Sequence, residues 1–190
     1  MAVTAGACSS GDSKSDTPSG GSGARPRQLP LTVTAADVVS PDNPMVTFDH
    51  PARAIIEKKV QRVFEATVVK PLTTGAGGNI NELFTHDAAV HANLGDRPAM
   101  FDENQPRMER VVPDQLEVQL TGLAGGDGNP VLVIAKVAWR VHSPDRSLRV
   151  EREGELTFTP VFGNWFVSAY EMAVTRISGA TSTTTTAVKE

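Results

Sequence analysis

The chain has 190 residues, of which 39% are hydrophobic and 21% charged, so its composition is that of a globular protein with one domain. A formal net charge of −4 and the lack of any basic run argue against a nucleic-acid binder. One cysteine, Cys8, excludes an internal disulfide and a cysteine-based zinc site. No apolar stretch approaches the ~20 residues that span a bilayer. No cofactor or metal motif is found in the sequence, and we expect neither.

Residues 1–28 are predicted to lie outside the folded domain. Residues 9–23 consist almost entirely of serine, glycine and other small or polar residues, which cannot bury enough apolar surface to offset the entropy of ordering. This segment is predicted to be a flexible linker. Before it, the small residues 2–7 lead to Cys8, where the chain turns abruptly polar.

The segment around Cys8 resembles the cleavage end of a bacterial lipoprotein signal peptide. The resemblance implies that Cys8 is lipidated and that the linker tethers an exported domain to the outer face of the cytoplasmic membrane. It has two departures: Ala5 stands where a leucine is usual, and residues 1–7 lack the positive start and long apolar run of a signal peptide. The resemblance therefore requires a true start upstream of Met1; otherwise residues 1–28 are a small-residue tail on a cytoplasmic protein.

The first half of the domain contains one clear helix pattern. Residues 31–39 alternate briefly and predict a short strand or extended edge segment before the turn at 40–44. Residues 52–69 carry apolar side chains at three- and four-residue spacing, which predicts a long amphipathic helix closed by Pro71 and the glycines at 75–78. Residues 80–113 are expected to form short pieces and loops.

The second half changes to a period of two. Apolar residues alternate with polar ones along 116–120, 131–141, 148–158 and 165–176, separated by turn sequences, which predicts a four-stranded antiparallel meander. Phe166, Tyr170, Met172 and Val174 are expected to share one face of the last strand. Arg149 and Arg152, with nearby glutamates, are predicted to form a solvated face. Residues 178–190, with four consecutive threonines, are predicted to be a disordered tail.

These elements predict an α+β fold over residues 29–177, in which the long N-terminal helix packs on a curved antiparallel sheet. The core between helix and sheet is expected to contain seven large apolar residues: Ile56, Val60, Phe64, Trp139, Leu156, Phe158 and Phe166. The order of elements, and the strand, turn and Trp-led strand of residues 152–167, resemble the nuclear transport factor two-like (cystatin-superfamily) domains. The resemblance implies a cone-like sheet around the helix and a homodimer through the sheet. Within that superfamily the chain looks most like exported actinobacterial lipoproteins, including members associated with lipid-import systems.

Enzymatic members of this superfamily place an acidic or histidine base beside a tyrosine or aspartate donor in the cone. The candidates for such a role here are His86, Asp87, His91, Asp102 and Tyr170. The alternatives are that His86 and Asp87 begin a surface helix and that Tyr170 belongs to the core. His86 and His91 lack the four-residue spacing of a helical zinc pair.

Two functions are therefore open. The first, which we favour, is a non-enzymatic cell-envelope lipoprotein whose cone binds an apolar small molecule or a protein partner. The alternative is a small isomerase-, cyclase- or dehydratase-like enzyme with an acid-base pair in the cone. The fold alone does not choose between them.

Overall fold

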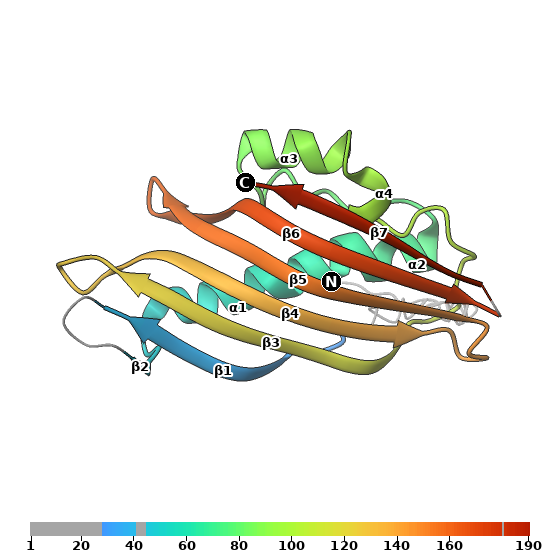
Figure 1. Ribbon diagram of the computed structural model, residues 1–190, viewed down its shortest axis with the longest axis horizontal. Helices are drawn as coiled ribbons and strands as arrows, with labels where there is room; N and C mark the ends of the chain where they lie inside the picture. Colours follow the sequence, from blue (N-terminus) through green and yellow to red (C-terminus); the bar gives the residue numbers. More distant parts are fainter. Residues whose placement is uncertain (1–27, 41–44, 180) are drawn as a thin grey trace, which may run out of the picture.

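The computed structural model describes residues 28–40, 45–179 and 181–190. Two strands come first, followed by a group of helical segments and then by five consecutive strands (Figure 1). The elements are β1 Thr32–Val39, β2 Val46–Thr47, α1 Pro51–Phe64, the π-helical segment η1 Glu65–Val69, α2 Lys70–Thr74, α3 His86–Asn93, α4 Arg97–Met100, β3 Val112–Ala124, β4 Pro130–His142, β5 Leu148–Val161, β6 Asn164–Ser178 and β7 Thr181–Lys189. The expected α+β class is confirmed.

The strands form one seven-stranded sheet in the order β2-β1-β3-β4-β5-β6-β7. Strands β3 to β7 are an antiparallel meander, whereas β1 runs parallel to β3. The predicted four-strand meander is thus the centre of a larger sheet. Helices α1 and α2 cross one face of this curved sheet, here called the inner face, while α3 and α4 lie at its β7 end (Figure 1).

The long helix differs from its prediction in place and in length. Strands β1 and β2 precede it, so it is not N-terminal in the domain, and it runs through Pro71 to Thr74. Pro71 is tolerated because the helix widens: the Lys70 N–H bonds to the Glu65 carbonyl, five residues back. The Ala66 carbonyl is thus left without a helical donor, since proline has no N–H, and it accepts one from Gly78 at 2.8 Å instead.

The helix ends follow standard local rules. At the start, the ring nitrogen Nδ1 of His50 accepts a hydrogen bond from the Ala52 N–H, and Pro51 occupies the first turn. At the end, Gly75 adopts a left-handed φ of 77° and its N–H bonds to the Pro71 carbonyl. Glycine is the residue that takes this conformation without strain.

The core between helix and sheet contains six of the seven residues expected there. Each of the six is at most 1% exposed, and Phe64 meets Trp139 edge to face with ring centroids 5.1 Å apart: Ile56, Val60, Phe64, Trp139, Leu156 and Phe158. Placing Phe166 there was wrong. The pairing of β5 with β6 shifts register between Thr157 and Phe158, so a bulge in β6 turns Val167 inward and leaves Phe166 half-buried.

The prediction of a disordered tail at 178–190 is also wrong. Residues 181–189 form β7, which pairs along β6 from Ser178 to Tyr170, and Ala187 is 1% exposed. Composition suggested disorder because the segment carries little apolar surface. The β-branched threonines nevertheless suit a strand, and β6 supplies an otherwise open edge with which the backbone pairs. Among the described residues, no helix is long and apolar enough to cross a membrane.

Candidate functional site

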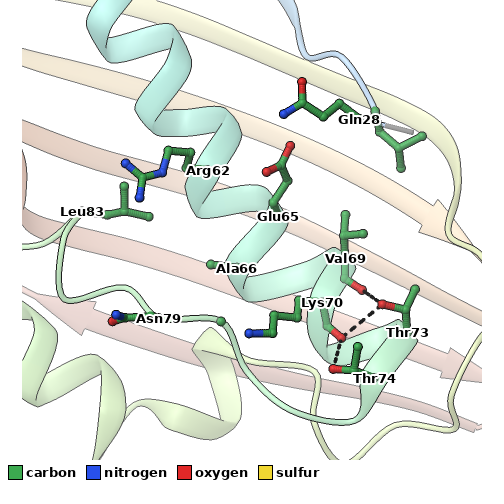
Figure 2. Close-up of a pocket in the computed structure, with 12 residues that line it drawn as sticks. Gln28, Arg62, Glu65, Ala66, Val69, Lys70, Thr73, Thr74, Asn79 and Leu83 are labelled. Carbon is green, nitrogen blue, oxygen red and sulfur yellow. Dashed lines mark hydrogen bonds between the residues drawn. The ribbon is translucent and has the colours of Figure 1, made fainter. Parts of the chain in front are cut away.

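One large hollow lies on the outer side of the long helix, away from the sheet. It has a volume of about 920 Å³ and runs along the last turn of α1, η1 and α2 (Figure 2). Its lining residues come from these helical segments, from the chain entering β1 and from the loop after α2: Gln28, Leu29, Arg62, Glu65, Ala66, Val69, Lys70, Thr73, Thr74, Gly78, Asn79 and Leu83. We call this hollow the helix groove.

Gln61 fixes one wall of the helix groove. Its side-chain NH₂ donates to the Leu29 carbonyl at 3.0 Å, and its side-chain oxygen accepts the Leu31 N–H at 3.2 Å. The same NH₂ also donates to the Glu65 carboxylate at 3.0 Å. One amide thus ties the extended chain at 29–31 to the helix, so that Leu29 stands beside the groove.

The opposite wall is the loop between α2 and α3. The Arg62 guanidinium binds the Glu82 carboxylate at 2.9 Å on the surface, and the Gly78 N–H binds Ala66 as described above. A Cβ at Gly78 would come within 2.5 Å of the Ala66 Cα, so glycine is required for this close approach. The loop can lie directly on the helix here because Ala66 carries only a methyl group and Gly78 has no side chain.

The helix groove has an apolar middle and a polar end. Leu29, Ala66, Val69 and Leu83 supply aliphatic surface. At the α2 end Figure 2 shows Lys70 with Thr73 and Thr74, whose hydroxyls donate to helix carbonyls. Lys70 is exposed, and within the described part of the chain no ion pair involves it. A cation available to a ligand therefore lies at one end of an aliphatic floor.

The histidine and aspartate candidates on α3 do not reach the helix groove. His86, Asp87 and His91 are exposed. His86 borders a separate hollow of about 640 Å³ between α3 and the β5-β6 hairpin, whose other lining residues are mostly apolar. Of the five candidates, three thus lie on the exposed side of α3, and none lines the helix groove.

Asp102 lies in the core, where it binds two arginines. It is 0% exposed; one carboxylate oxygen accepts from Arg152 Nη2 at 2.8 Å and the other from Arg176 Nε at 2.7 Å. Arg152 also donates to the carbonyls of Met100 at 3.1 Å and Thr67 at 3.4 Å. This group, here called the buried charge cluster, joins η1, the segment after α4, β5 and β6.

Neither arginine was expected in the core. Arg152 was assigned to a solvated face, but it is 1% exposed, and this assignment was wrong. The signal was available: Arg152 shares the parity of Val150 and Leu156 on β5, and Arg176 that of Val174 on β6. An arginine on the apolar parity of a strand between buried neighbours indicates a paired internal charge.

Tyr170, another of the predicted candidates, binds the carboxylate of Asp96. Its hydroxyl donates to Asp96 at 2.6 Å, and the residue is 2% exposed. Burial first and the Asp96 carboxylate second raise the pKa of the phenol above its ordinary value. Tyr170 is therefore held neutral, as a hydrogen-bond donor that fixes the start of α4 to β6. Neither Tyr170 nor Asp96 borders the helix groove.

Two further predictions concern binding groups. In the part of the chain that the structure describes, no three histidine, cysteine, aspartate or glutamate side chains gather as a metal site would require. Cys8, the expected lipidation site, lies outside the described residues. No protein-family model, curated protein or solved structure matches the chain.

Replacing Asp102 with asparagine should lower the free energy of unfolding by about 3–5 kcal/mol, because two buried guanidinium groups lose their shared counter-charge. Urea unfolding followed by tryptophan fluorescence measures the change. The matched control is Asp87→Asn on the exposed face of α3, with an expected change of about 1 kcal/mol or less. Equal effects of the two substitutions would contradict the structural role of the buried charge cluster.

Tyr170 is the only tyrosine, so phenolate absorbance reports on it alone. In the unfolded chain tyrosine ionises near pH 10, whereas burial holds the folded phenol protonated. Above about pH 10 the unfolded state therefore binds fewer protons, and stability should fall as pH rises. We expect phenolate absorbance to appear only together with unfolding, and Tyr170→Phe to weaken the stability loss above pH 10. Free titration near pH 10 in the folded protein would contradict this.

Proposed function

We propose that the protein is a non-catalytic binding module that holds an amphiphilic small molecule in the helix groove. Its apolar part lies over Ala66, Val69 and Leu83, and its anionic head meets Lys70. The observation that carries this proposal is the aliphatic floor ending at an exposed cation. A hollow of about 920 Å³ lies in the range of small-molecule sites, which run roughly from 300 to 1,000 Å³.

The place of the groove follows from how the interior is packed. The space between α1 and the sheet is filled by side chains such as Phe64, Trp139 and Phe158, each at most 1% exposed. A ligand is therefore proposed on the outer side of the helix rather than inside the cone. The helix groove coincides with η1, and π-helical turns are found frequently at functional sites.

The arrangement of titratable groups favours binding over acid-base catalysis. A general base must come within about 2.6–3.2 Å of the proton that it removes, or reach it through one water. Asp102 is occupied by Arg152 and Arg176 in the core, and Tyr170 donates to Asp96 away from the groove. The enzyme alternative thus has less support than a binding site.

The test is the binding of palmitate to the purified protein, measured by calorimetry. Val69→Asn places an amide on the aliphatic floor and should weaken binding about tenfold, since tenfold corresponds to about 1.4 kcal/mol. Lys70→Glu should also weaken binding, and more at low salt than at high salt because the attraction is screened.

Matched controls lie on the same helix but outside the groove. Ile55→Asn repeats the side-chain change at a position that is 45% exposed, and Lys58→Glu repeats the charge reversal on the exposed face of α1. Both should leave palmitate affinity unchanged, as should alanine at His86 and His91. Equal weakening by Lys58→Glu and Lys70→Glu would show that only net charge matters and would contradict the assigned site.

We further propose that the domain is displayed outside the cell as a lipoprotein, tethered through Cys8 by the serine- and glycine-rich residues 9–23. The support is the small-residue run before Cys8 and the abrupt polar change after it. The resemblance to exported nuclear transport factor two-like domains remains part of this proposal. It rests on a helix packed across a curved sheet whose strands β3 to β6 form an antiparallel meander, with β1, β2 and β7 as additional strands.

Lipidation predicts a simple partition experiment on the native protein from its source cells. An alkyne palmitate analogue should label the protein, which should enter the detergent phase on separation in a cloud-point detergent. Cys8→Ser should abolish the label and move the protein to the aqueous phase. Native protein found entirely in the aqueous phase with a free Cys8 thiol would contradict the tether.

A further inference from the structure

A third hollow, distinct from the helix groove and from the hollow beside His86, lies where β6 and β7 face the segment after α4. It has a volume of about 240 Å³. None of its nine lining residues is acidic and seven are polar: Pro98, Phe101, Asn104, Gln105, Arg176, Ser178, Thr181, Thr183 and Thr185. We call it the hydroxyl pocket. We propose that the hydroxyl pocket binds a small oxyanion, a free phosphate or the phosphate group of a small organic molecule.

Arg176 supplies the positive charge of this site. The residue is 9% exposed, so its guanidinium is held in place on the edge of the core. Nε donates to Asp102 at 2.7 Å and Nη2 to the Pro98 carbonyl at 2.7 Å. Among the described residues, no hydrogen bond engages Nη1. Two N–H groups of a fixed guanidinium thus remain for a ligand in the hydroxyl pocket that Arg176 lines.

The charge balance of the core favours an anion at this position. The buried charge cluster holds two guanidinium groups, Arg152 and Arg176, against the single carboxylate of Asp102. One positive charge is therefore uncompensated in a region where desolvation makes charge costly. Arg152 is 1% exposed, whereas Arg176 borders the hydroxyl pocket, so this pocket is where a counter-ion reaches the cluster.

Strand β7 supplies neutral hydroxyl groups opposite this charge. Because side chains alternate along a strand, Thr181, Thr183 and Thr185 share the face of the buried Ala187, and all three line the pocket. Ser178 adds a fourth hydroxyl, and Asn104 and Gln105 add side-chain amides. Hydroxyl, amide and guanidinium donors around one small cavity are the groups that bind phosphate oxygens.

The threonine face allows a test that leaves Arg176 and its bond to Asp102 untouched. Thr183→Val and Thr185→Val together remove two hydroxyls from the pocket and keep β-branched side chains of similar volume. The matched control is Thr184→Val with Thr186→Val, which makes the same change on the opposite face, where the Thr184 hydroxyl hydrogen-bonds to the Thr175 hydroxyl at 3.0 Å. Circular dichroism and thermal unfolding without ligand establish that both double variants fold.

Titrations with inorganic phosphate and with glycerol 3-phosphate, each at constant ionic strength, give the dissociation constants by calorimetry. We expect saturable binding of at least one of them to the unmodified chain, at least tenfold weaker binding to T183V/T185V, and unchanged binding to T184V/T186V.

Binding of phosphate alone identifies a free ion as ligand, and tighter binding of glycerol 3-phosphate identifies a phosphate ester. No saturable binding of either probe up to 10-millimolar-scale concentrations, or equal loss in both double variants, would overturn the proposal. Palmitate binding should be unchanged in T183V/T185V, which separates this outcome from the helix groove.

Discussion

The carboxylate of Asp102 is the contact on which the arrangement of the other parts depends. It is fully buried and binds Arg152 on β5 and Arg176 on β6, and these arginines in turn reach the carbonyls of Thr67, Pro98 and Met100. With the bond from Arg176 to the Phe101 carbonyl at 3.5 Å, six hydrogen bonds connect the inner face of the sheet with the long helix and with the chain around α4. A buried ion pair adds little net stability compared with apolar packing, but its directional bonds allow only one placement of these segments.

The same region explains why the helix is distorted. Pro71 removes one N–H from the helix, and the carbonyls of Ala66 and Thr67 accept hydrogen bonds from groups outside it. Gly78 binds the first on the outer side, and Arg152 binds the second on the inner side. Both carbonyls of the distorted segment therefore have a hydrogen-bond donor, one from each side of the helix. The loop that Gly78 brings onto the helix becomes a wall of the helix groove, so the local chemistry of one proline shapes the proposed binding site.

Local pattern predicts most elements of this chain because each carries an apolar face of regular period. The helix at 52–69 and the strands β3 to β6 were expected from such faces, and their buried residues agree. Pattern failed where tertiary contacts override it. Because of the bulge in β6, Val167 rather than Phe166 points into the core. The threonine-rich segment forms β7 because the edge of β6 is available for pairing. Neither outcome is contained in the periodicity of the segment itself.

The fold and the candidate sites can both be divided into what the sequence determined and what the tertiary structure decided. The sequence by itself determined the α+β class, the central meander and the apolar core, because hydrophobic periodicity reports which side of each element is buried. It also named Asp102 and Tyr170, but as candidate acid-base residues beside His86, Asp87 and His91. Only the tertiary structure decided that Asp102 pairs with Arg152 and Arg176, that Tyr170 meets Asp96, and that the hollows lie beside η1 and β7. These pairs are separated by 50 to 74 positions in the chain, and such contacts depend on how elements dock rather than on local spacing.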